Sequence, residues 1–183
     1  MEKFRRASEL PDLARLSLTY AAIGATRPGE RHWVEAAPGF RRSETTTYVG
    51  RWTQTWERAA SAVLRWGVKT RSGFTVEPQD PVQVGQRRWV RARLGPLTIS
   101  EPVEVVAVVV EPDRMGFAYG TLAGHPVSGE EAFVVDRDDQ DRVWLTLRSL
   151  TRAAPTGLWR VAFPATLVAQ RVYRRRYQRS LGR

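Results

Sequence analysis

The chain has 183 residues, a length typical of one folded domain, and its 42% hydrophobic and 26% charged residues are the composition of a globular protein. It contains no cysteine, which excludes disulfides and thiolate metal sites. No apolar run reaches the roughly 20 residues of a membrane helix, and the N-terminus lacks a secretory signal. We therefore expect a cytoplasmic protein with a single domain over residues 1–183.

The positive charge is concentrated at the C-terminal end. The net charge is +10, and the segment of about 170–183 contains no acidic residue. Its arginines include Arg171, Arg174, Arg175, Arg176 and Arg179. Such an excess attracts phosphates, anionic membranes or acidic partners. A solvated helix face is the alternative interpretation.

The segment before residue 50 gives weak structural signals. Leu16, Leu18 and Tyr20 alternate with polar residues, which predicts a short strand there. From Gly24 the chain is rich in glycine, proline and polar residues, so we expect a long loop with a short strand around residues 43–49. A loop of this length in a small domain is often functional.

A helix is predicted over residues 51–68. Apolar residues recur there at alternating spacings of four and three, which makes one continuous stripe along a helix. The stripe consists of Trp52, Trp56, Ala59, Val63 and Trp66. Gly67 is expected to end this helix, because glycine commonly follows the last helical turn. Core packing is the expected role of the tryptophans.

Strand-like segments then follow one another up to about residue 152. In the clearest of them, Val90, Ala92 and Leu94 form one face, and the residues between them form the other. The composition of residues 136–142, DRDDQDR, is typical of a hairpin turn. Successive strands without intervening helices imply an antiparallel meander.

A long C-terminal helix is predicted from about Thr156 onward. Its apolar stripe consists of Leu158, Val161, Ala165, Val168 and Val172, with Tyr173 and Tyr177 on a neighbouring line. Pro164 is expected to kink this helix or to mark the first turn of its second half. Because the tyrosines extend the stripe, we expect them to pack in the core and the arginines to point outward.

This order of elements predicts an α+β fold with a helix-grip-like architecture, in which a curved antiparallel sheet wraps around the C-terminal helix. Such a sheet leaves a cavity between itself and the helix, and concave sites of this kind bind small ligands. The pattern is similar to the helix-grip fold of the birch-pollen-allergen, START and polyketide-cyclase superfamily. Fold alone does not fix function.

The stretch YGTLAGHPVSGEEAF, residues 119–133, gathers polar side chains between two predicted strands. Adjacent residues of a strand point to opposite faces, so only one of Glu130 and Glu131 can point into the cavity. Glu131 shares its face with Phe133, and we expect it to be the inward one. The stretch also contains His125.

Four motifs carry a resemblance to a known family. They are TYAAIGATR (Thr19–Arg27), LGPL (Leu94–Leu97), EPDRMGFAYGTLAGHPVSGEEAFVV (Glu111–Val135) and the basic ending AQRVYRRRY. Together they resemble uncharacterised protein family 0548, the domain of unknown function 1990. The central Gly-Thr-Leu-x-Gly-His-Pro followed by Gly-Glu-Glu-x-Phe is specific in order and spacing. The resemblance implies a helix-grip-like domain and brings no established activity.

These observations favour a protein that binds a small hydrophobic or amphipathic molecule between its sheet and its C-terminal helix. The ligand's polar end would contact Tyr119, Thr121, His125 and Glu131. The expected apolar walls are Trp56, Val63, Trp66, Val168 and Val172. Two distant histidines with scattered acids do not make a metal site, and no cofactor motif is present, so we expect neither a metal nor a cofactor.

Three other interpretations stay open. His125 and Glu131 could form a buried hydrogen-bonded pair that pins the hairpin. Alternatively, the arginine-rich helix end could bind the phosphates of nucleic acid or of another polyanion. Arg87, Arg88, Arg91 and Arg93 would extend that surface if they share an exposed face. The third interpretation is an enzyme of cyclase or hydrolase type with His125 as general base.

Overall fold

A seven-stranded antiparallel sheet forms the centre of the computed structural model, which describes residues 10–34, 37–94 and 97–182. The strands are β1 (Arg41–Arg51), β2 (Phe74–Val76), β3 (Arg87–Leu94), β4 (Leu97–Glu111), β5 (Arg114–Thr121), β6 (Val127–Arg137) and β7 (Arg142–Ala153). From β2 to β7 each strand pairs with the next, and β1 pairs with β7 at the far edge. The predicted antiparallel meander is confirmed.

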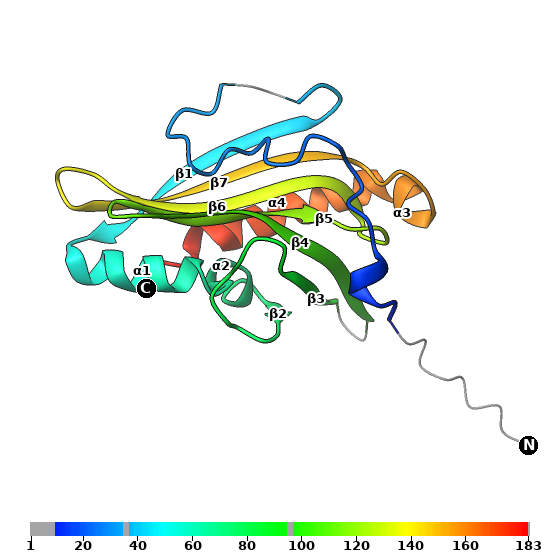
Figure 1. The fold of residues 1–183 in the computed structure, drawn as a ribbon, viewed down its shortest axis with the longest axis horizontal. Coiled ribbons are helices and arrows are strands. Elements are labelled where there is room, and N and C mark those ends of the chain that lie inside the picture. Colours follow the sequence, from blue (N-terminus) through cyan, green and yellow to red (C-terminus); the bar gives the residue numbers. More distant parts are fainter. Residues whose placement is uncertain (1–9, 35–36, 95–96, 183) are drawn as a thin grey trace, which may run out of the picture.

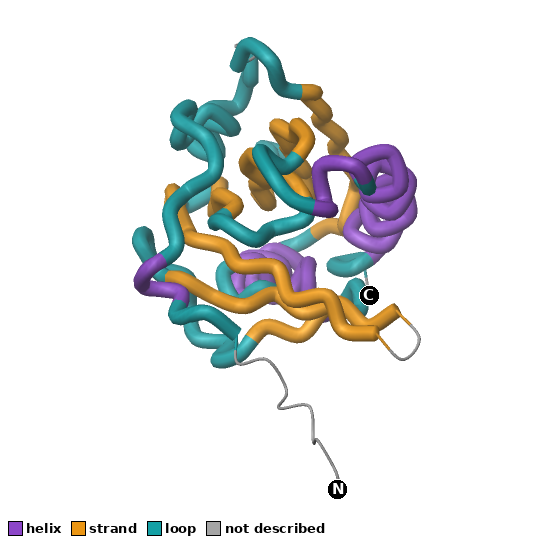
Figure 2. Tube along the Cα trace, turned by 90° about the vertical axis from the view of Figure 1, so that its right-hand side faces the viewer, coloured by secondary structure: helices purple, strands orange, loops and turns teal. Residues whose placement is uncertain are grey.

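The two faces of the sheet are covered by different parts of the chain. They are the 3-10 helix η1 (Leu13–Arg15) and the α-helices α1 (Thr53–Val63), α2 (Gly67–Thr70), α3 (Leu158–Val161) and α4 (Phe163–Arg179). The α1, α2 and α4 helices lie on one side of the sheet, here called the helix face, and the chain before β1 crosses the other side, the loop face (Figure 1). Seen from the side, the strands curl and α4 lies beside them (Figure 2). The expected helix-grip-like architecture is confirmed.

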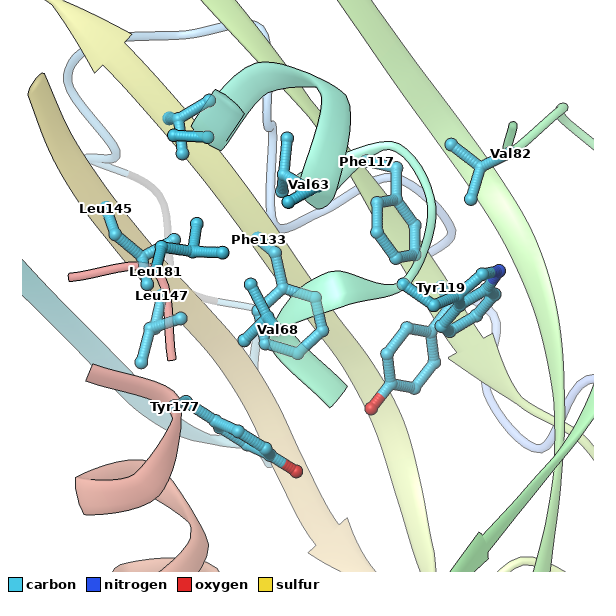
Figure 3. Packing of buried hydrophobic residues seen from close by; sticks show 14 of the residues in the cluster. Val63, Val68, Val82, Phe117, Tyr119, Phe133, Leu145, Leu147, Tyr177 and Leu181 are labelled. Atoms are coloured by element: carbon cyan, nitrogen blue, oxygen red, sulfur yellow. The ribbon is translucent and has the colours of Figure 1, made fainter. Parts of the chain in front are cut away.

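The core lies on the helix face. Trp66 packs edge-on against Phe117 with ring centroids 4.7 Å apart, and Phe117 lies 5.8 Å from Phe133 on the next strand. Val63 from α1 and Leu145 from β7 are fully buried in the same cluster (Figure 3). Each such side chain contributes about 1.5–3 kcal/mol when it leaves water. The core therefore fixes α1 and α2 on the sheet.

The prediction of a strand at Leu16–Tyr20 was wrong. Only an isolated bridge between Leu18 and Leu122 forms in that part of the described chain. The hydroxyl of Tyr20 instead donates a hydrogen bond to Glu130 over 2.8 Å. Two backbone hydrogen bonds, from the Thr19 amide to Thr121 over 3.0 Å and from the Ala123 amide to Ser17 over 2.9 Å, flank this bridge, and no longer ladder forms in this segment.

The predicted helix over residues 51–68 is two helices. The first, α1, ends at Val63, and Trp66 adopts a left-handed conformation with φ 62° before Gly67 begins α2. Gly67 therefore does not end the helix as expected. A Cβ atom at this position would lie 2.5 Å from the carbonyl oxygen of Ala62, so glycine allows α2 to approach α1 closely.

The C-terminal helix packs through its aromatic residues. Pro164 lies in the first turn of α4, as one of the two alternatives predicted. The ring of Tyr173 lies 4.6 Å from Phe74, and Tyr177 is buried. Val168 and Val172 are 58% and 50% exposed, so the expectation that they line the cavity was wrong. Tyr173 and Tyr177 face the sheet in place of the valines, because the larger aromatic rings bury more apolar surface.

Candidate functional site

A cavity of about 120 Å³ lies between the helix face of the sheet and α4. Strands β2 to β7 contribute one wall, and α3 and α4 contribute the other. Its apolar lining includes Phe74, Ile99, Trp159, Ala169 and Tyr173. Its polar lining includes Lys69, Glu101, Tyr119, Thr121, His125, Glu131, Gln170 and Arg174. The cavity is therefore apolar with one strongly polar region.

A buried lysine organises the polar region. The ammonium of Lys69 lies 3.0 Å from a carboxylate oxygen of Glu131 and donates to the hydroxyl of Tyr177 over 2.8 Å. The hydroxyl of Tyr119 donates to the same oxygen of Glu131. Rings of Phe74 and Tyr177 lie 4.6 and 5.0 Å from the ammonium. A carboxylate, a hydroxyl and ring faces thus replace the water that Lys69 loses on burial.

The two tyrosine hydroxyls stay protonated. Burial raises the pKa of Tyr119 well above its usual value, and the negative charge of Glu131 raises it further. The pKa of Tyr177 is raised by the same two causes in the same order. Both groups therefore act as neutral hydrogen-bonding groups in the cavity wall.

Glu101 on β4 is a second carboxyl group in this region. Burial raises its pKa from 4.5 to about 7, an effect that the Lys69 charge opposes and the Glu131 charge reinforces. Its nearest basic atom is Nε2 of His125, 3.8 Å away, which is beyond hydrogen-bonding distance. Near neutral pH this group therefore exchanges between the ionised and the protonated form.

His125 presents an unpaired ring nitrogen. Its Nδ1 atom lies 3.1 Å from the amide nitrogen and 3.0 Å from the carbonyl oxygen of Val127. Burial, and then the Lys69 charge, lower the pKa of His125 from 6.5 to about 3, so the ring is neutral and makes no ion pair with Glu101. The Nε2 atom is buried and has no hydrogen-bond partner among the described residues.

Gln170 on α4 adds a second unpaired atom. Its Oε1 is buried and also lacks a partner within the described part of the chain. His125 and Gln170 both line the cavity, from opposite walls. Buried polar groups are normally hydrogen-bonded. Two unpaired polar groups in the residues around one cavity are therefore the arrangement expected of a binding site for a polar ligand atom.

Glu130 has a different environment from its neighbour. Its carboxylate accepts hydrogen bonds from the Tyr20 hydroxyl and the Gly24 amide, each over 2.8 Å, and from the Thr26 amide over 2.9 Å. Burial raises the pKa of Tyr20, and the Glu130 charge adds to this effect. Glu130 therefore holds the loop on the loop face, while the Glu131 carboxylate lies at the cavity.

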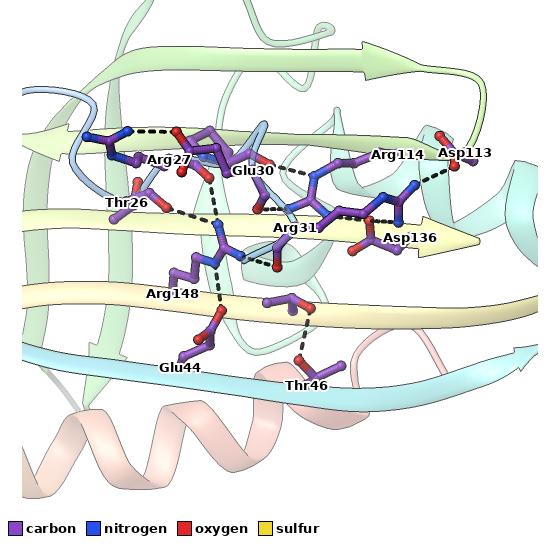
Figure 4. Close-up of polar contacts among 12 residues, drawn as sticks. Thr26, Arg27, Glu30, Arg31, Glu44, Thr46, Asp113, Arg114, Asp136 and Arg148 are labelled. Carbon is purple, nitrogen blue, oxygen red and sulfur yellow. Dashed lines mark hydrogen bonds and ion pairs between the residues drawn. The ribbon is translucent and has the colours of Figure 1, made fainter. Parts of the chain in front are cut away.

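Two buried arginines fix the same loop. Arg148 donates to the backbone oxygens of Arg27 over 2.6 Å and Arg31 over 3.1 Å, and to Glu44 over 2.8 Å (Figure 4). Arg114 donates to the backbone oxygens of Pro28 over 2.8 Å and Glu30 over 3.0 Å. Most of the TYAAIGATR motif, together with the residues after it, thus lies over the sheet as a structural cover.

The structure brings four of the predicted site residues together. Tyr119, Thr121, His125 and Glu131 all line the cavity. Trp56 and Trp66 are buried in the core and are not among its lining residues. They belong to α1 and to the turn after it, and both are part of the hydrophobic core on the helix face.

The expected pair of His125 and Glu131 does not form. Glu131 binds Lys69, and the carboxyl group nearest to His125 is that of Glu101. Four further residues of the polar region, Lys69, Glu101, Gln170 and Tyr177, were not predicted as site residues. Sequence signals existed for two of them, since Glu101 precedes a proline in a β-branched strand and Tyr177 extends the stripe of the helix. Lys69 gave no signal, because a single lysine after a helix is usually exposed.

The C-terminal arginines do not form one group. Arg174 donates to the hydroxyl of Ser149 over 2.9 Å and lines the cavity. Arg176 lies over the ring of Tyr173 and is exposed, as are Arg171, Arg175 and Arg179. In the second basic group, Arg87 pairs with Glu104 over 2.6 Å and the guanidinium of Arg88 lies 3.9 Å from Asp80.

Within the described ranges, no helix has the length and apolar character to cross a membrane.

Comparisons with known proteins place the chain in a family. The model of the domain of unknown function DUF1990 matches residues 19–180. A UPF0548 protein of Deinococcus radiodurans is 43% identical over 95 residues, which cover 52% of this chain and 47% of that protein. A UPF0548 protein of Arabidopsis thaliana is 26% identical over 122 residues, 63% of this chain and 60% of that protein. The matches thus span about half or somewhat more of these relatives.

Two solved structures are similar in part. A hypothetical protein of Helicobacter pylori gives a TM-score of 0.49 at 13% identity, covering 76% of this chain and 88% of that chain. The structure of Ara h 8.0201 gives a TM-score of 0.46 at 11% identity, and the match covers 79% of this chain and 100% of that chain. The family match over residues 19–180 and the motifs that carry it show that this chain belongs to the DUF1990, or UPF0548, family.

Proposed function

We propose that the protein binds a small hydrophobic or amphipathic molecule in the cavity between the sheet and α4. One observation carries this proposal: two residues that line a mostly apolar cavity, His125 and Gln170, each have a buried polar atom (Nε2 and Oε1) without a hydrogen-bond partner among the described residues. A ligand atom between these walls would satisfy groups that otherwise cost free energy.

The cavity's size and lining support a modest ligand. Its volume of about 120 Å³ is smaller than the roughly 300–1,000 Å³ of pockets for drug-sized molecules. A short chain or one ring would fit, with the polar end near His125 and Glu101 and the apolar part against Phe74 and Trp159. Glu101 accepts a hydrogen bond when ionised and can donate one when protonated. The polar end of the cavity therefore accommodates more than one kind of polar ligand group.

A catalytic function has less support. A general base must be free to accept a proton near neutral pH, and burial lowers the pKa of His125 to about 3. Glu131, which would orient the imidazole in such a mechanism, is bound to Lys69 instead. Binding therefore explains the cavity better than a reaction based on His125.

A cavity-filling variant tests the proposal. Ala169 lines the cavity from α4, whereas Val168, the preceding residue, is 58% exposed. Ala169→Phe should fill the cavity, and Val168→Phe adds a ring of the same size on the outer side of the helix. Binding of the one-ring amphipathic molecule 4-propylphenol to each protein is measured by isothermal titration calorimetry, alongside thermal unfolding.

We expect Ala169→Phe to weaken probe binding by about tenfold or more, and Val168→Phe to leave it within about twofold of wild type. Equal binding by the two variants would show that the probe sits outside the cavity. Mass spectrometry of an organic extract of the purified protein identifies any molecule that already occupies the site. Absence of probe binding to a wild-type protein whose extract contains no such molecule would also contradict the proposal.

A further inference from the structure

The outward side of α4 has an unusual combination of side chains. Positions three or four apart share one side of a helix, and those on the outer side alternate between valine and arginine. They are Val168, Arg171, Val172, Arg175 and Arg179, all exposed. The opposite side carries Gln170, Tyr173 and Tyr177 toward the cavity and the core. The helix thus has one ligand-facing side and one solvent-facing side.

The short helix α3 carries two more exposed aliphatic side chains. Leu158 is 88% exposed and Val161 is 81% exposed. Together with Val168 and Val172 they place four large aliphatic side chains in solvent within residues 158–172. Single exposed apolar residues are ordinary, but several along consecutive helices indicate a surface that contacts something else.

The charge around these residues has one sign. No aspartate or glutamate occurs in the sequence after Asp141, and Arg160 adds a further exposed arginine on α3. Within the described ranges, no ion pair involves Arg160, Arg171, Arg175 or Arg179. These guanidinium groups are therefore available to anionic groups of a partner.

The mixture of aliphatic and cationic side chains favours a lipid surface over nucleic acid. Single-stranded nucleic acid stacks its bases on aromatic rings. Tyr173 and Tyr177, the aromatic residues among these arginines, pack against Phe74 instead. Exposed valine and leucine contribute nothing to phosphate binding, whereas a helix that lies on a bilayer inserts such side chains between its cationic groups.

We propose that the outer side of α3 and α4 binds the surface of an anionic membrane. Arg171, Arg175 and Arg179 would contact lipid phosphates, and Val168 and Val172 would enter the boundary between headgroups and acyl chains. The helix would lie in the plane of the membrane without crossing it. This inference does not depend on which molecule occupies the cavity.

Vesicle sedimentation with the full-length protein tests the proposal. The vesicles consist of phosphatidylcholine, either pure or with about 30% phosphatidylglycerol, at low and at physiological salt. The cationic variant is Arg171→Gln/Arg175→Gln/Arg179→Gln. Its control, Arg41→Gln/Arg58→Gln/Arg93→Gln, removes the same number of charges from exposed positions on β1, α1 and β3. The apolar variant is Val168→Ser/Val172→Ser.

We expect the wild-type protein to bind only the anionic vesicles, and the α4 arginine variant to lose about tenfold or more of its partition coefficient. The control should stay within about threefold of wild type, and the valine variant should fall between the two. Thermal unfolding of each variant verifies that it is folded.

Three outcomes would overturn the proposal. The first is that the wild-type protein fails to bind anionic vesicles. In the second, the control loses as much binding as the α4 variant, which would mean that net charge alone attracts the protein. In the third, the valine variant binds vesicles like wild type and single-stranded RNA displaces the protein, which would assign the arginines to nucleic acid.

Discussion

The ammonium group of Lys69 and the hydroxyl of Tyr177 form a 2.8 Å hydrogen bond that joins α2 to α4. These residues are 108 positions apart in the sequence. The same ammonium reaches Glu131 on β6, 3.0 Å away. A single buried charge thus connects three elements around the cavity, and α4 depends on it because Tyr177 is the one residue of this helix that is buried.

Replacing this lysine should destabilise the protein. In Lys69→Met the carboxylate of Glu131, only 21% exposed, loses its counter-charge. Removal of one partner of a buried pair costs about 3–5 kcal/mol. We expect a loss of about 3 kcal/mol in the free energy of unfolding, measured with urea. The double variant Lys69→Met/Glu131→Gln should regain part of it, and strictly additive losses would show that the two groups are not coupled.

Glu101 should make the folded protein less stable as the pH rises. Its pKa is raised from 4.5 to about 7, so the folded chain holds this proton more tightly than the unfolded chain between these values. Glu101→Gln removes this effect. Near pH 8 the free energy of unfolding of the variant should exceed that of wild type by at most about 3 kcal/mol, and near pH 4 the two values should be equal. A difference that does not change with pH would refute the assignment.

His125 should act in the opposite direction. Its pKa is lowered from 6.5 to about 3, so the unfolded chain binds the proton first and stability is lost as the pH falls below 6.5. His125→Asn lacks this titration. When the pH falls from about 7 to 5, the free energy of unfolding should decrease in both proteins, and the decrease should be about 2 kcal/mol smaller in the variant than in wild type. Parallel pH profiles for the two proteins would be inconsistent with a buried neutral histidine.

The contact between α1 and α2 can be tested at one glycine. A Cβ at Gly67 would lie 2.5 Å from the backbone oxygen of Ala62, which cannot move without displacing α1. We expect Gly67→Ala to cost about 1–3 kcal/mol in thermal or urea unfolding. Gly29→Ala is the control, since its Cβ would find Val109 at an ordinary 3.8 Å, and its effect should stay within about 0.5 kcal/mol.

Local patterns were sufficient to predict most of the sheet. Val90 and Ala92 are buried on the face that alternation assigns to them, and the turn at residues 136–142 joins β6 to β7. The same alternation separates Glu130 from Glu131 across β6. Strand patterns are reliable here because each strand has one face in the core.

The contacts around the cavity were less predictable, because they depend on residues far apart in the chain. The burial of Lys69 is explained only by Glu131 and Tyr177 on other elements. On α4, valines and tyrosines formed two neighbouring apolar lines, and periodicity alone does not decide which line faces the sheet. The ring contact between Tyr173 and Phe74 decides it.

The position of Glu130 and Glu131 on β6 makes this strand sensitive to changes in length. Deletion or insertion of one residue before this pair would exchange the two faces, because side chains in a strand alternate with a period of two. The carboxylate that anchors Tyr20 and Gly24 would then point toward Lys69, and its neighbour would lose the lysine. Length variation should therefore be tolerated at the tight turn around Asp138–Asp141, which lies beyond both clusters, and not within β6 itself.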